Sequence, residues 1–108
     1  MLLFAPVADP FSTMIHPDAS TLLEELIGEV VVFDLISSYV CLGTFAGMDR
    51  DFLDVRDADL HDFRDSTKTR ELYVYDSIRL GIRRNRARVL LRRSEVVGVT
   101  RFSEVVES

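Results

Sequence analysis

Apolar and polar positions change their period along the chain, and these changes predict the first elements. After a Pro-punctuated start, residues 18–26 carry leucines at helical spacing, and Gly28 follows as a helix terminator. Val30–Leu35 and residues 39–46 are rich in β-branched and apolar side chains, which predicts two strands. Residues 52–58 alternate between apolar and charged positions, which is typical of a third strand with one exposed face.

The pattern then returns to a helical period over residues 67–80. The apolar positions that fall on roughly one face of this helix are Leu72, Val74, Tyr75 and Ile78. Ser66 or Thr67 is placed to cap this helix, and Gly81 is placed to end it. A competing interpretation makes residues 71–75 a strand, because aromatic and β-branched residues favour that state. The capping residue at the start and Gly81 at the end favour the helix, which is therefore predicted.

Two further strands are predicted at residues 89–92 and 96–102, joined by a tight turn at residues 93–95. Sequential short strands imply an antiparallel meander or barrel. Gly43 falls inside a predicted strand, where glycine is unfavourable unless the backbone bends or another group packs closely. The expected fold is therefore mainly β, a strongly bent five-stranded antiparallel sheet or small barrel.

The length of 108 residues corresponds to one domain, in which residues 1–17 are an irregular tail. Hydrophobic residues make up 47% of the chain, which is enough for a core, and a chain this short gains stability from oligomerisation. The apolar first residues are too short to span a membrane and lack a preceding basic group, so we expect a cytoplasmic protein without a membrane partner. Cys41 is the only cysteine, which excludes an intrachain disulfide and favours a buried small hydrophobe.

Two segments far apart in the sequence carry recognisable motifs. The first is Gly43-Thr-Phe-Ala-Gly-Met-Asp49, and the second is Leu91-Arg92-Arg93 followed by the apolar Val96-Val97. In their spacing they resemble the two signature motifs of the Sm/LSm family, small SH3-type bent-sheet proteins that assemble into rings and often bind RNA. The resemblance implies an Sm-like domain over residues 18–108, with an N-terminal helix and a helix inserted in the variable loop at about 60–86. An unrelated SH3-like or OB-like barrel is the alternative.

The resemblance also implies an RNA site, provided that one extra residue is allowed after Asp49. In RNA-binding members of the family an aromatic ring, an Asn and an Arg hold a uridine. Phe52 takes the stacking place, Asp54 the Asn place and Arg92 the Arg place, while Asp49 orients the loop. Arg93 stands where the family usually has glycine, and it adds a positive charge.

Asp54 departs from the family pattern in its chemistry. An ionised carboxylate only accepts hydrogen bonds, whereas the amide of Asn also donates. Asp54 would suit an amino group of adenine or cytosine better than uracil, or it is a solvated strand residue. The second motif also lacks the Tyr-Lys-His-Ala sequence of the bacterial RNA chaperone of this family, so the chain is predicted to be a divergent relative.

Charge is distributed unevenly along the chain. The net charge of −5 argues against a protein that coats nucleic acid non-specifically. An acidic stretch from Asp49 to Asp65 precedes a basic cluster, which allows three interpretations: a contact between subunits, a phosphate-binding rim, or a solvated face. The cluster consists of Arg79, Arg83, Arg84, Arg86, Arg88, Arg92 and Arg93.

No other motif indicates a reaction. His61 lies among Asp59, Asp62 and Asp65, a combination that metal sites use, but no second His is near it in sequence, and the segment is predicted to be a loop. We therefore predict no metal, no cofactor and no enzymatic activity. Tyr73 and Tyr75 are interpreted as packing residues of the inserted helix, with base stacking as the alternative.

The functional expectation is a homo-oligomeric ring of five to seven subunits, in which the last strand of one subunit pairs with the fourth strand of the next. The ring would hold short single-stranded RNA at its pore through Asp49, Phe52, Asp54, Arg92 and Arg93. The alternative is a non-catalytic Sm-like scaffold that binds proteins and no RNA.

Overall fold

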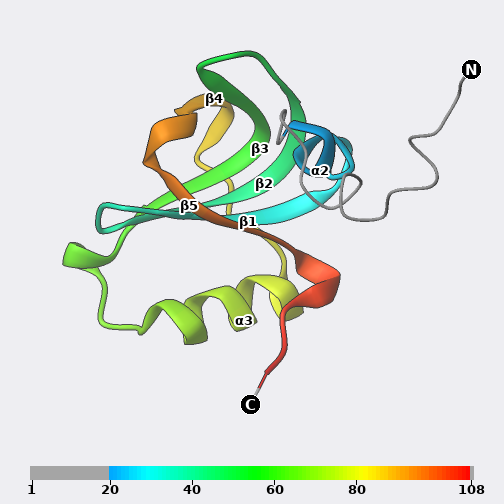
Figure 1. Cartoon of the computed structure of the whole chain (residues 1–108). Helices are drawn as coiled ribbons and strands as arrows, with labels where there is room; N and C mark the ends of the chain where they lie inside the picture. The colour runs from blue at the N-terminus through cyan, green and yellow to red at the C-terminus, as the bar shows by residue number, and fades with distance from the viewer. Residues whose placement is uncertain (1–19, 108) are drawn as a thin grey trace, which may run out of the picture.

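The computed structural model describes residues 20–107, and its centre is one strongly curved antiparallel sheet (Figure 1). The sheet order is β4-β3-β2-β1-β5, so consecutive strands pair as a meander and the last strand returns to pair with the first. This confirms the predicted fold class of a bent five-stranded antiparallel sheet with two helices. The strands are β1 (Val30–Leu35), β2 (Tyr39–Met48), β3 (Phe52–Asp62), β4 (Arg86–Arg92) and β5 (Val96–Arg101).

The strands are mostly longer than the sequence pattern indicated. β2 and β3 continue past the expected ends, so the segment between β3 and β4 covers residues 63–85 and does not begin at residue 60. β4 begins at Arg86 instead of residue 89, and the side chain of Asn85 extends its ladder by bonding both the N–H and the carbonyl of Leu60, at 3.0 and 3.1 Å. β5 ends at Arg101, where a 3-10 turn (Phe102–Glu104) begins.

The sheet bends where Gly43 of β2 passes a bulge in β3. A Cβ atom at Gly43 would lie 2.8 Å from Val55 Cγ1, 2.9 Å from the Arg56 carbonyl oxygen and 3.1 Å from the Ala58 Cα. The pairing register shifts beside this point, and Asp57 has a φ of 49° in the bulge. The prediction that Gly43 serves a bend or a close approach is confirmed.

One apolar core fills the concave side of the sheet. Phe33 and Phe45 are fully buried there and meet edge to face, with ring centroids 5.7 Å apart. Cys41 belongs to this core as predicted, and burial raises the pKa of its thiol to about 12. Leu23 and Leu26 pack against the same cluster.

The inserted segment forms helix α3 (Arg70–Leu80), which lies across the other face of the sheet (Figure 1). The helix is confirmed and the strand alternative at residues 71–75 is wrong. Its start was misplaced, because Thr69 is the N-cap and accepts a hydrogen bond from the Leu72 N–H at 3.2 Å. Gly81 ends the helix with a φ of 100°, which agrees with the prediction.

Helix α3 packs through a narrower face than its sequence suggested. Val74 and Ser77 are its buried residues, and Val74 joins a second apolar cluster with Val32, Val40 and Leu42. Leu72, which was expected on the buried face, is 44% exposed. The helix therefore covers a sheet face that would otherwise meet solvent, and leaves much of its own apolar surface outside.

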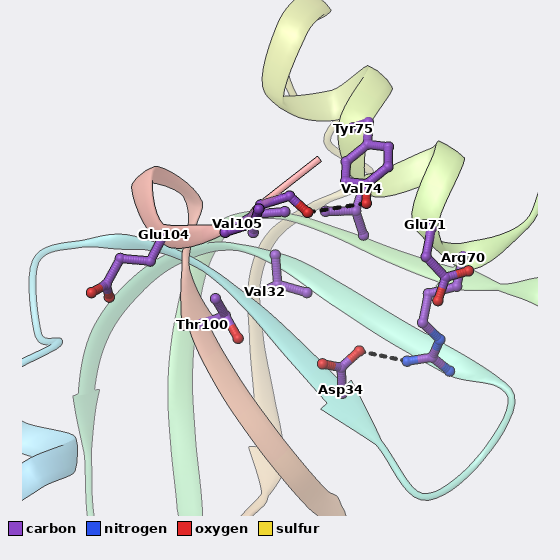
Figure 2. Close-up of a pocket in the computed structure, with 10 residues that line it drawn as sticks. Val32, Asp34, Arg70, Glu71, Val74, Tyr75, Thr100, Glu104 and Val105 are labelled. Atoms are coloured by element: carbon purple, nitrogen blue, oxygen red, sulfur yellow. Dashed lines mark hydrogen bonds and ion pairs between the residues drawn. The ribbon is translucent and has the colours of Figure 1, made fainter. Parts of the chain in front are cut away.

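Polar contacts fix α3 to β1 and to the C-terminal segment. Arg70 forms an ion pair with Asp34 of β1 at 2.7 Å, and the Tyr75 hydroxyl donates to the Val106 carbonyl at 3.2 Å (Figure 2). Between these contacts lies a cavity of about 260 Å³ whose apolar wall includes Val32 and Val105. The cavity marks the seam between helix and sheet.

The first helix of the described region is α2 (Ser20–Glu24), and a turn follows it to Gly28. Gly28 has a φ of 95° and donates its N–H to the Phe45 carbonyl at 2.7 Å, which attaches this turn to β2. The expected tail at residues 1–17 and helix start at residue 18 lie outside the described residues. Within residues 20–107, no helix has the length and apolarity that crossing a membrane requires.

Candidate nucleic-acid interface

The loop between β2 and β3 is built around the side chain of Asp49. Its Oδ1 atom accepts the backbone N–H groups of Asp51 and Phe52, at 2.9 and 2.8 Å. The hydrogen bond from Phe52, then that from Asp51, lowers the pKa of the Asp49 carboxyl. A carboxylate that holds two N–H groups in this way fixes the tight turn that leads into β3.

Arg93 joins this loop to the turn between β4 and β5, a 3-10 turn over Arg93–Glu95. Its guanidinium Nη1 donates to the Asp49 carbonyl at 2.8 Å, and its backbone N–H donates to the Asp51 carbonyl at 2.8 Å. The residue that replaces the family's glycine therefore connects the two motif segments. The hydrogen bond to Asp49 uses one nitrogen of the Arg93 guanidinium, Nη1.

Phe52 and Arg92 are direct partners across β3 and β4. The guanidinium carbon of Arg92 lies 5.5 Å from the centroid of the Phe52 ring, which is cation–π distance. Phe52 is half-buried and Arg92 is exposed. The structure thus brings together the two groups that were predicted to hold a base from opposite sides.

Asp54 lies next along the same face of β3, but its carboxylate is already engaged. Arg56 donates to its two oxygens at 2.9 Å each, and Arg88 donates to them at 3.0 and 3.2 Å. The hydrogen bonds from Arg56 and then Arg88 hold the pKa of Asp54 well below its usual range, so the group is ionised at neutral pH. This differs from the free, edge-reading carboxylate that the resemblance suggested.

A shallow cavity of about 210 Å³ lies between these groups. Its wall includes Asp49, Phe52 and Asp54 from the predicted set, and also Arg88 and Leu90 of β4. The sequence analysis counted Arg88 only in the basic cluster, and it did not consider Arg56 or Leu90. The alternation of a strand could have placed Arg88 and Leu90 on the same face as Arg92, because every second residue of β4 points the same way. In the structure this exposed set is Arg86, Arg88, Leu90 and Arg92, while Leu91 is buried.

The predicted basic cluster is divided among several acidic partners. Arg79 pairs with Glu107 and Asp76, Arg84 pairs with Asp57, and Arg88 pairs with Asp54. The arginines extend from α3 along the connecting segment onto β4, so they do not form one patch around the Phe52 site. Part of the acidic stretch is thus matched to the basic cluster within a single chain.

The other chemistry-bearing residues lie at the far end of β3. His61 is in β3 and not in a loop, which corrects its expected place, and its ring stacks on Tyr73 of α3 with centroids 4.1 Å apart. Phe63 packs edge-on against both rings. Tyr73 and Tyr75 are thus packing residues of α3, as predicted.

Comparison of the sequence with protein-family models and with curated proteins gives no match. Comparison of the structure gives clear matches. The Sm protein of Pyrococcus abyssii, solved in complex with a uridine heptamer, superimposes with a TM-score of 0.53 at 12% identity, over 78% of this chain and 97% of that one. An Sm-like protein of Archaeoglobus fulgidus gives 0.52 at 12% identity, over 81% and 97%. The heptameric SmAP1 of P. aerophilum gives 0.50 at 15% identity, over 81% and 96%.

The class defined by these observations is the small, strongly bent, five-stranded antiparallel sheet with a short helix before its first strand. Within that class the chain has the Sm-like fold, since nearly the whole length of each of these archaeal proteins is matched. Helix α3 lies between β3 and β4, in the segment where the sequence analysis placed an inserted helix.

Proposed function

We propose that this protein forms a ring of identical chains that binds short single-stranded RNA at its pore. The observation that carries the proposal is the Phe52–Arg92 pair, held in place by the connection from Arg93 to Asp49. It brings an aromatic face and a cation together at the junction of the two motif segments. The likeness to a structure of an Sm protein with a uridine heptamer supports the choice of ligand.

The free edges of the sheet support the ring. β4 and β5 are the two outer strands of the sheet, and each leaves one side of its backbone unpaired among the described residues. Both edges expose an apolar side chain, Leu90 at 50% and Val97 at 66%. Pairing β5 of one chain with β4 of the next would satisfy both edges and would close after five to seven subunits.

The roles in binding follow from the contacts. A base stacks on the Phe52 ring, where stacking works for every base. The Arg92 guanidinium, which lies 5.5 Å from the ring centroid, moves off the ring and contacts the base from its other side. Asp54 holds Arg88 beside the cavity, so that Arg88 faces the phosphate or the edge of the base. Asp49 and Arg93 keep the two turns in register. Because the Asp54 oxygens are occupied, we propose that discrimination between bases is weak.

The test is a titration of fluorescently labelled oligoribonucleotides of each base, at low and moderate salt. Saturable binding at micromolar protein that weakens with salt is expected, since each phosphate contact releases counterions. An absence of binding to every homopolymer at micromolar protein would contradict the proposal.

A second function, a scaffold that binds proteins and no RNA, is favoured by one observation. The carboxylate in the base-reading position is neutralised by arginines of the same chain, and the whole chain carries a net charge of −5. The ultraviolet absorbance ratio of the ring purified from cells separates the two functions. Copurified nucleic acid supports RNA binding, whereas a ring that elutes clean and also fails the titration supports the scaffold.

A further inference from the structure

The inserted helix creates a second cavity, remote from the Phe52 site. It lies between the end of β3 and helix α3, and its volume is about 440 Å³, compared with about 210 Å³ at the nucleic-acid interface. Asp59 and His61 of β3 form one side, and Tyr73 and Ser77 of α3 form the other. This volume lies in the range of small-molecule sites, which makes the cavity a candidate in its own right.

Three polar groups in this cavity lack a protein partner. Asp59 is only 5% exposed, and its carboxylate forms no hydrogen bond or ion pair with any other residue of the 20–107 region. The His61 Nε2 and the Tyr73 hydroxyl are buried and have no hydrogen-bond partner in the same region. Buried polar groups are normally paired because leaving them unpaired is costly, so two unpaired atoms beside a nearly buried carboxyl mark this cavity as a place for a polar ligand.

Four charged residues line the cavity, and two of them form an ion pair with each other while the other two do not. Lys68 and Asp76 neutralise each other at 2.6 Å. Burial raises the pKa of Asp59, and the nearby positive charges of His61 and Arg83 oppose that rise. Arg83 lines the cavity and forms no ion pair among the described residues. The cavity thus offers one negative and one positive group to a ligand that carries both charges.

We propose that this cavity binds a small zwitterion of the free α-amino acid class, with its ammonium group on Asp59 and its carboxylate on Arg83. An ammonium group supplies three donors to a carboxylate, and a guanidinium matches the fork of a carboxylate. The His61 Nε2 and the Tyr73 hydroxyl then hydrogen-bond the remaining polar groups of the ligand. The site is independent of the proposed RNA function, because it lies at the opposite end of β3 and uses none of the same residues.

The test begins with isothermal titration of the standard L-α-amino acids into the wild-type protein. At least one should bind with a dissociation constant on the order of 1 mM or tighter. Its N-acetyl and α-amide derivatives, which each lack one charge, should bind at least about ten-fold more weakly. No binding by any amino acid, or equal binding by the derivatives, would overturn the proposal.

Two variants locate the site, with one matched control. Arg83→Gln and Asp59→Asn should each weaken binding of the selected amino acid at least about ten-fold. Arg84→Gln is the control, because the neighbouring arginine is outside the cavity and pairs with Asp57. Arg83 is exposed, so its variant is expected to fold, which keeps the test decisive if Asp59→Asn perturbs the structure. Unchanged binding in Arg83→Gln, or an equal loss in Arg84→Gln, would overturn the proposal.

Discussion

The guanidinium of Arg92 lies over the ring of Phe52, 5.5 Å from its centroid, although the two residues belong to separate motif segments of the chain. Antiparallel pairing of β3 with β4 places them opposite each other. A hydrogen bond from Arg93 in the β4–β5 turn to the Asp49 carbonyl connects this turn to the β2–β3 loop. Both groups therefore lie at one place, and a flat ligand can stack on the ring once the guanidinium moves aside.

Arg92→Ala should weaken RNA binding and reduce its salt dependence. The variant loses one face of the base site and one positive charge near the backbone, so the slope of log affinity against log salt should fall by about 1. Fluorescence titration at several salt concentrations measures both effects. Arg64→Ala is the matched control, since Arg64 pairs with Asp62 at the other end of β3, and an equal change there would argue for a non-specific charge effect.

Phe52→Ala should weaken binding by removing the stacking surface, while Phe52→Tyr should keep most of it. Stacking of a base on an aromatic side chain contributes about 1–3 kcal/mol, so the alanine variant should bind roughly five- to 150-fold more weakly. The same titration measures the ratio. If alanine and tyrosine behave alike, the ring does not stack on a base.

Gly43→Ala should destabilise the fold by about 1–3 kcal/mol, because the new methyl group would overlap Val55 and the β3 backbone. Gly47→Ala is the control in the same strand, since a Cβ there meets nothing within 4 Å. Chemical denaturation of both variants measures the difference in unfolding free energy. Equal stability of the two would mean that the sheet does not bend tightly at Gly43.

Val97→Glu should disrupt assembly by placing a charge on an edge where an apolar contact between subunits is proposed. Leu90→Glu should act in the same way from the other edge, because both side chains are exposed in the single chain. Light scattering should give the mass of one chain for each variant, with an unchanged circular dichroism spectrum. Rings that persist in both variants would mean that these edges do not form the interface.

Asp59→Asn should stabilise the protein at neutral pH and have little effect in acid. Burial raises the pKa of Asp59 above its ordinary value of 3.8. A carboxyl group with a raised folded pKa contributes its stability below the unfolded pKa, and that contribution is lost as the pH rises through the folded pKa. Asn does not ionise, so urea denaturation from pH 7 down to about pH 4 should show a gain that shrinks as the pH falls. Asp51→Asn, at an exposed position, is the control, and a pH-independent gain at Asp59 would contradict this explanation.

The sequence predicted best where local chemistry alone determines structure. The β-branched run of Val30–Leu35 could form little other than a buried strand, and its bounds were predicted correctly. The start of α3 was misplaced because Ser66, Thr67 and Thr69 are all residue types that cap helices, and the helix begins after Thr69. More residues of α3 were expected to be buried than the structure buries. Helical spacing shows which residues share a face, but it does not show how many of them contact the sheet.

The sequence indicated only part of the candidate site, because it did not single out Arg56, Arg88 or Leu90 there. Phe52 and Arg92 could be paired through the motif resemblance. The engagement of Asp54 by Arg56 and Arg88 depends on strand register, which the sequence pattern does not supply. The hydrogen bond from Arg93 to the Asp49 carbonyl joins two turns. The sequence shows that Arg93 stands where the family pattern has glycine, but it does not reveal this hydrogen bond.

Native mass spectrometry of the purified protein with a short single-stranded oligoribonucleotide tests the central claim most directly. The account predicts a particle of five to seven chains that carries bound RNA, and a lower RNA occupancy in Arg92→Ala with the ring intact. A single chain, or a ring that carries no RNA at micromolar concentrations of both components, would contradict it.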